Sequence, residues 1–119
     1  MHELSIAHNI VDTCNQAAEE AGADQVTVVH LRLGALSGVV TQSLQFSWDI
    51  ATTGTKLAGA QLVIEELPVV VHCPSCAKAV ELPDGYRFRC PVCNTPTPDV
   101  VQGKELEIVS IEIPETDTV

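Results

Sequence analysis

Aromatic residues, cations and long apolar runs are all scarce in this sequence. Aromatic side chains make up 3% of the 119 residues and hydrophobic residues 45%, so any core must be built from aliphatic side chains. No run of ~18 uncharged apolar residues occurs, which argues against a membrane-spanning helix. The beginning also lacks the basic region and apolar run of a signal peptide. We therefore expect a small globular protein in the cytoplasm.

The low number of cations leaves the chain strongly acidic. Six Lys and Arg residues stand against sixteen Asp and Glu residues, which gives a formal net charge of −10. Because nucleic acids are bound largely through neutralisation of their phosphates, this balance argues against a nucleic-acid partner. An acidic surface instead suits cations or a partner with a basic patch, although most of these carboxylates are expected only to be solvated.

Apolar periodicity predicts two helices and three strands in the rest of the chain. They are a helix at 3–21, a strand at 25–33, a helix from Thr41 to just before Gly54, and strands at 60–67 and 105–113. Thr41 is expected to cap the second helix with its hydroxyl. The inner face of that helix should carry Leu44, Trp48 and Ala51.

Three chemically active side chains on these elements are expected to be structural. Cys14 falls on the apolar stripe of the first helix, which favours a buried small hydrophobe over a nucleophile. His8 lies towards the margin of the same stripe and should pack at the edge of the core. His30 should lie on the surface of the first strand.

The segment 68–103 differs from its surroundings. It holds four closely spaced cysteines and most of the chain's seven prolines, and a proline-rich segment cannot extend a sheet far. We therefore expect an α+β protein with an inserted zinc-ribbon-like minidomain built on four cysteines. Residues 1–67 plus 104–119 form an α/β-type lobe of two helices on a small mixed three-stranded sheet, and residues 68–103 form the insert.

The four cysteines of the insert form two CxxC pairs. Cys73 and Cys76 are separated from Cys90 and Cys93 by thirteen residues, and two CxxC turns can place four thiolates around one tetrahedral metal. The pattern favours Zn²⁺, with iron as the minor alternative and a redox dithiol weaker still. Nearby Lys78, Arg87 and Arg89 can offset the resulting charge. Because all four ligands come from the protein, the metal is expected to be structural rather than catalytic.

The first three residues form a second candidate metal site. Met1 supplies a terminal amine, His2 supplies an imidazole, and the peptide nitrogen of His2 lies between them. Such nitrogen-rich surroundings favour Ni²⁺ or Cu²⁺ over Zn²⁺. Glu3 can add a carboxylate ligand, orient the imidazole, or favour the helix start by its charge. A short motif of this kind indicates little by itself.

Several motifs together resemble one known family. "MHEL" at the start, "LRLGALSGV", "GAQLVIEELP", CPSC with CPVC, and "GKELEIVSIEI" appear in this order across essentially the whole chain. They are similar to the HypA/HybF family of hydrogenase maturation nickel metallochaperones. The resemblance implies an α/β lobe that holds Ni²⁺ through Met1, His2 and nearby backbone nitrogens, with Glu3 as ligand or support.

The resemblance also implies ligands and partners. Cys73, Cys76, Cys90 and Cys93 match the family's zinc ligands. The expected partners are a maturation GTPase and the large subunit of NiFe-hydrogenase, with urease as a further recipient in some members. Two departures stand out: Asn94 follows the second pair where a glycine turn is common, and no histidine lies between Cys73 and Cys93.

Two other classes of function compete with this interpretation. A zinc-ribbon module for nucleic acid is disfavoured by the net charge and by the scarcity of aromatics. A zinc-containing adaptor without transferable metal would leave His2 inert. An enzyme is not expected, because the chain shows no nucleophile elbow, no phosphate-binding glycine loop and no catalytic zinc triad.

Overall fold

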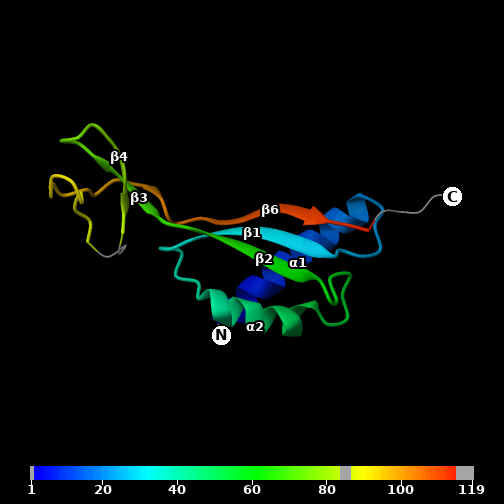
Figure 1. Ribbon diagram of the computed structural model, residues 1–119. Helices are drawn as coiled ribbons and strands as arrows, with labels where there is room; N and C mark the ends of the chain where they lie inside the picture. The colour runs from blue at the N-terminus through cyan, green and yellow to red at the C-terminus, as the bar shows by residue number, and fades with distance from the viewer. Residues whose placement is uncertain (1, 84–86, 115–119) are drawn as a thin grey trace. The chain divides into compact units, whose positions relative to one another are not determined.

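The computed structural model describes residues 2–83 and 87–114 (Figure 1). Its elements in chain order are α1 (His2–Glu20), β1 (Val28–Gly34), α2 (Thr41–Thr52), β2 (Gln61–Leu67), β3 (Val69–Cys73), β4 (Lys78–Leu82), β5 (Val100–Gln102) and β6 (Leu106–Glu112). The two expected helices and three expected strands are confirmed, and the α+β class with them. Within the described residues, neither helix combines the length and the hydropathy that a bilayer crossing requires.

The chain divides into two compact units. The helical unit comprises Met1–Leu31, Val39–Ile64 and Ile108–Val119, and the cysteine unit comprises Arg32–Gly38 and Glu65–Glu107. Both helices belong to the helical unit.

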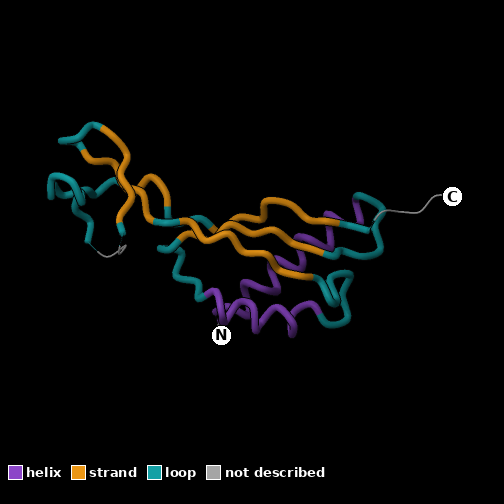
Figure 2. Tube along the Cα trace, viewed as in Figure 1, coloured by secondary structure: helices purple, strands orange, loops and turns teal. Residues whose placement is uncertain are grey.

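The larger sheet has the strand order β2-β1-β6 and carries α1 and α2 on one face (Figures 1 and 2). β1 and β2 run in the same direction, as their flanking hydrogen bonds show. At the start of both strands the Gln61 amide donates to the Thr27 carbonyl (2.9 Å), and at their end the Ala35 amide donates to the Leu67 carbonyl (3.0 Å). The intervening helix α2 supplies the crossover that parallel neighbours need.

β6 runs antiparallel to β1. The Thr27 amide, before the start of β1, donates to the Glu112 carbonyl at the end of β6 (2.8 Å). The Gly34 amide, at the end of β1, donates to the Glu105 carbonyl just before β6 (2.8 Å). The three-stranded sheet is therefore mixed, as expected from the sequence.

An aliphatic core with one tryptophan fills the space between the helices and this sheet. Cys14 is 1% exposed, and the expected inner face of α2 is confirmed, with Leu44, Trp48 and Ala51 all buried. The Trp48 indole donates to the Ala60 carbonyl (2.9 Å), so the largest buried side chain keeps its polar atom satisfied. The remaining core residues are Ala7, Ile10, Val11, Ala18, Val26, Val29, Leu31, Leu57, Ala60 and Leu62.

Two local expectations are wrong. His8 is exposed rather than packed at the core edge, because the buried face of α1 is centred on Ala7, Val11 and Cys14 and one residue further turns about 100° away. Thr41 is the first residue of α2 rather than its cap. Val40 holds the cap position and makes no side-chain capping bond there.

The cysteine unit has its own antiparallel sheet, of order β4-β3-β5. β3 and β4 pair in a hairpin that aligns Val69 with Leu82 and Cys73 with Lys78. Its small core consists of Val69, Val71, Cys73, Val80, Leu82 and Cys90. Two of the four paired cysteines are thus core residues of this unit as well as candidate ligands.

Candidate metal centres

The four paired cysteines converge in the cysteine unit. Cys73 ends β3, Cys76 lies in the turn before β4, and Cys90 and Cys93 lie in a second turn ahead of β5. The four Sγ atoms all lie within 4.8 Å of one another, and no other group of three or more candidate ligands does so among residues 2–83 and 87–114. The two CxxC pairs therefore form one site.

The spacing of the sulfur atoms matches a tetrahedral metal. The Sγ–Sγ distances are 3.5 Å for Cys73–Cys93, 3.6 Å for Cys76–Cys93 and 3.9 Å for Cys76–Cys90. Four thiolates at ~2.3 Å from one zinc ion stand about 3.8 Å apart, whereas a disulfide requires ~2.05 Å. All five cysteines are free. The chemistry and the size of the donor set thus fit Zn²⁺.

Backbone amides near the sulfur atoms support this arrangement. The Cys76 amide donates to the Sγ of Cys73 (3.3 Å), and the Val92 amide donates to the Sγ of Cys90 (3.4 Å). Each CxxC turn therefore directs an N–H group at its first cysteine. Because donors of this kind stabilise thiolates, both turns are organised for an anionic sulfur centre.

A left-handed residue follows each pair and reverses the chain. Ala77 has φ 54° and Asn94 has φ 62°, the only positive values at non-glycine residues in the described part of the chain. Asn tolerates this conformation well, which accounts for the departure from glycine noted in the sequence, whereas Ala adopts it at a cost of roughly 1–2 kcal/mol. The two pairs thus share one turn geometry despite different sequences.

The four cysteines differ in exposure. Cys73 and Cys90 are buried, Cys76 is half-buried and Cys93 is exposed. The site consequently has a protein-covered side and a side that faces solvent. The Arg89 guanidinium donates to the Asn94 carbonyl (3.0 Å), which places one of the expected cations beside the second pair.

Contacts with Thr95 distinguish Cys93 from the other thiols. The Thr95 hydroxyl lies 3.2 Å from the Sγ of Cys93 and donates to the hydroxyl of Ser75 (2.9 Å). Hydrogen bonding with the side chain and the backbone of Thr95 lowers the pKa of the Cys93 thiol to about 6. Hydrogen bonds with the Sγ atoms of Cys93 and Cys73 raise the pKa of the neighbouring Cys76 thiol to about 12. Sequence reasoning did not single out Thr95.

The second candidate site begins α1. Met1 lies outside the described residues. His2 is the first residue of α1 and is exposed, while Glu3 is half-buried beside it. The Val40 amide, at the cap of α2, donates to Oε2 of Glu3 (3.3 Å), so the beginning of α1 lies beside the start of α2 (Figure 1). Val40 is 37 residues away in sequence, and no local signal points to this contact.

The helix start leaves nitrogen atoms available. The first four N–H groups of an α-helix have no partner within the helix, so the amides of His2 and Glu3 are not needed for its ladder. A cation at this end is opposed by the helix dipole, and the carboxylate of Glu3 in the first turn offsets part of that opposition. An exposed imidazole with an adjacent carboxylate at a helix start is compatible with a small cation site.

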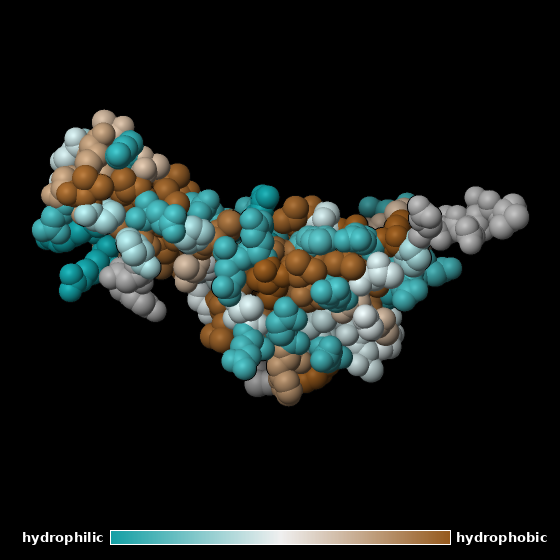
Figure 3. Space-filling view, in the orientation of Figure 1, coloured by the Kyte–Doolittle hydropathy of each residue, from teal (hydrophilic) through white to brown (hydrophobic). Residues whose placement is uncertain are grey.

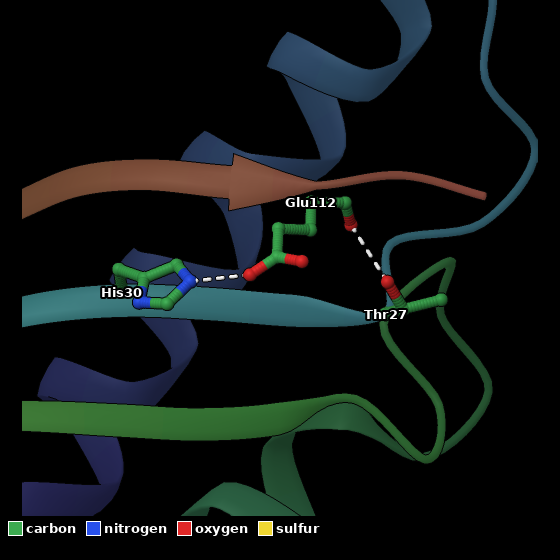
Figure 4. Close-up of polar contacts among 3 residues, drawn as sticks. All are labelled: Thr27, His30 and Glu112. Atoms are coloured by element: carbon green, nitrogen blue, oxygen red, sulfur yellow. Dashed lines mark hydrogen bonds and ion pairs between the residues drawn. The ribbon is translucent and has the colours of Figure 1, made fainter. Parts of the chain in front are cut away.

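His30 lies on the open face of the larger sheet, as expected. Its Nε2 lies 2.5 Å from Oε2 of Glu112, and the Thr27 hydroxyl donates to the Glu112 carbonyl at 3.1 Å (Figure 4). Apolar side chains appear between hydrophilic ones over the strands of this sheet (Figure 3). The pair joins the end of β6 to β1, and we interpret it as structural.

Comparisons of the sequence match one family along nearly the whole chain. A family model described as hydrogenase/urease nickel incorporation, metallochaperone, HypA matches residues 1–113. A Chloroflexus aurantiacus protein named hydrogenase maturation factor HypA is 57% identical over 114 residues, which cover 96% of this chain and 100% of the relative. A protein of the same name from a Roseiflexus species is 52% identical over 118 residues, covering 99% and 95%.

Two solution structures have a similar fold. One, described as that of HypA protein, has a TM-score of 0.70 at 20% identity and covers 96% of this chain and 97% of that one. The other, described as the Ni metallochaperone HypA from Helicobacter pylori, has a TM-score of 0.64 at 18% identity and covers 93% and 96%. At these identities the likeness concerns the fold alone.

Proposed function

Because this chain belongs to the HypA family of hydrogenase/urease nickel-incorporation metallochaperones, we propose that it binds Ni²⁺ at its first three residues and delivers it. The recipient is the large subunit of NiFe-hydrogenase, with urease as the alternative recipient, and a maturation GTPase assists the transfer. The protein acts in the cytoplasm and is not an enzyme, because its cargo leaves chemically unchanged.

The proposed nickel ligands are nitrogen atoms of consecutive residues. The Met1 amine, the His2 imidazole and the amide nitrogen between them close fused chelate rings, which suit Ni²⁺. Glu3 acts as a support or an additional ligand. The observation that carries the proposal is the exposure of His2 on the first helical turn, next to a carboxylate that the Val40 amide orients.

A site of this construction is suited to transfer. It stands at a chain end and a helix start, so an incoming ligand can displace one donor at a time. Protons compete for the same nitrogen atoms, so nickel binding should weaken on acidification. The acidic character of the chain adds a diffuse attraction for a divalent cation and for basic partner surfaces.

The four cysteines, in this proposal, hold a structural Zn²⁺. Cys73, Cys76, Cys90 and Cys93 supply all four thiolates, and the ion supplies a cross-link that the small core of this part of the chain lacks. The proposed domains are a nickel-binding domain of residues 1–67 plus 104–119 and a zinc-binding domain of residues 68–103. The zinc-binding domain offers a rigid surface and no vacant ligand position.

Isothermal titration of Ni²⁺ into zinc-loaded protein at neutral pH tests the nickel site. His2→Ala should weaken binding by at least tenfold, equivalent to ~1.4 kcal/mol. His8→Ala is the matched control, since His8 is also an exposed histidine of α1 and should bind as wild type does. A two-residue extension before Met1 should weaken binding without removing any side chain.

Three outcomes contradict the proposal. Equal affinities of wild type and His2→Ala remove His2 from the site. Full affinity of the extended protein removes the terminal amine. Stoichiometric zinc with no nickel uptake by wild type supports the competing interpretation of an adaptor without transferable metal.

A further inference from the structure

A surface groove lies beside the start of α1 and along α2. Its lining residues are Glu3, Leu4, Gln42, Ser43, Phe46 and Ser47, all within the helical unit, and its volume is about 430 Å³. Phe46 is 71% exposed. This exposure is unusual because the chain has few aromatic residues for its core, namely one Trp, one Tyr and two Phe. The groove therefore combines a solvent-exposed aromatic wall with a residue of the proposed nickel site.

A second apolar side chain extends this wall along α2. Ile50, one helical turn after Phe46, is 49% exposed. Single exposed hydrophobic residues are common on protein surfaces, but two neighbouring ones beside a groove are typical of a protein-binding site. Aromatic anchors that fill or flank a pocket usually dominate such interfaces.

The helical unit, which contains the groove, is strongly acidic. The helical unit holds nine of the chain's sixteen acidic residues and one of its six basic residues, and α1 and α2 contain no Lys or Arg. The one basic residue, Lys56, donates to the Ala23 carbonyl (3.1 Å). Asp49 is exposed between Phe46 and Ile50 on α2. A basic surface is therefore the electrostatic complement of this unit.

We propose that this groove, here called the α2 groove, docks a protein surface that inserts one apolar side chain beside Phe46 and surrounds it with Lys and Arg residues. The inference rests on the proposed function, because a partner seated beside Glu3 lies next to the cargo it receives. A second copy of this chain is not the proposed occupant, since two chains of formal net charge −10 repel each other.

The purified maturation GTPase and the purified hydrogenase large subunit are the probes, each titrated into nickel-free protein so that docking is read separately from metal binding. Phe46→Ser should weaken binding of at least one probe roughly 30-fold. Val101→Ser is the matched control, since Val101 is also largely exposed (60%) but lies in the cysteine unit, outside both cysteine turns, and the affinity of this variant should stay within about twofold of wild type. Ile50→Ser should also weaken binding of the probe, which tests the apolar wall at a second position.

Two charge-reversal variants test whether Lys and Arg residues of the partner surround the groove. Asp49→Lys should weaken binding, whereas Glu81→Lys, an exposed residue of β4, should not. Added salt should weaken the wild-type complex, because it screens the attraction between an acidic and a basic surface.

Several results overturn the docking proposal. One is that Phe46→Ser binds both probes as tightly as wild type does, and another is that wild type binds neither probe. A third is that wild type forms a dimer and that the Phe46→Ser substitution dissociates it. Nickel affinity of Phe46→Ser should remain within about twofold of wild type, since an exposed α2 side chain is no ligand. Failure of wild type to bind nickel refutes the proposed function separately, because docking is measured without metal.

Discussion

Loss of one thiolate from the cysteine site should unfold one part of the chain and leave the other. Cys90 is 2% exposed and its Sγ lies 3.9 Å from that of Cys76. Metal binding contributes about 10–16 kcal/mol in small zinc peptides, whereas entire domains are stable by only about 5–15 kcal/mol. A core of six residues cannot compensate for a loss of that size. Cys90→Ala should therefore release zinc and disorder the proposed zinc-binding domain.

The expected result can be read from three measurements. Bound zinc should fall from one ion per chain towards none. Amide exchange in β3, β4 and β5 should approach the rate of an unfolded chain. The 19 residues of α1 and the 12 of α2 lie outside residues 68–103, so far-UV ellipticity at 222 nm should fall by less than about a tenth.

Cys14→Ala is the matched control for this experiment. Cys14 is a buried cysteine of α1 that is no candidate ligand, so its removal should lower stability by about 1 kcal/mol and leave zinc bound. Slow exchange in β3 of Cys90→Ala would refute the dependence on metal. Loss of both helices would refute the proposed division into residues 1–67 plus 104–119 and residues 68–103.

Two further variants probe the cysteine turns. Ala77→Gly should stabilise the zinc-loaded protein by about 1 kcal/mol, because it relieves a left-handed conformation at φ 54° that glycine adopts freely; an unchanged or lower urea midpoint contradicts this. Thr95→Val should raise the pKa of Cys93 from about 6 towards the ordinary range, because it removes the side-chain hydrogen bond that lowers it. Because a higher pKa of Cys93 lets protons compete with zinc more strongly as the pH falls, the variant should lose more zinc affinity at pH 6 than at pH 8. Parallel pH profiles in competition titrations would contradict this role of Thr95.

Most of the fold was predictable because its elements carry strong local patterns. The apolar stripe of α1 placed Cys14 inside, and the period of α2 placed Leu44 and Trp48 against the sheet, as the structure confirms. The errors concern element margins. His8 and Thr41 were misplaced because a shift of one residue on a helix changes the direction of a side chain by about 100°.

The contacts around the candidate sites were less predictable. Glu3 meets the Val40 amide across 37 residues, and the Thr95 hydroxyl meets that of Ser75 across 20 residues. Residue type and spacing carry no information about such pairs, since each depends on where distant segments pack. The left-handed conformation of Ala77 was likewise hidden, because alanine is a poor indicator of positive φ.

The sequence by itself determined the candidate donor residues: two CxxC pairs, Met1 followed by His2, and a surplus of carboxylates. These follow from residues that are adjacent or a few positions apart, where covalent geometry limits what they can reach. The tertiary structure brings these four sulfur atoms, up to 20 residues apart, within 4.8 Å of one another, as the spacing predicted. It also left Cys93 on the solvent side and Phe46 exposed beside Glu3. Such placements depend on the packing of whole elements, and no short stretch of the chain encodes that packing.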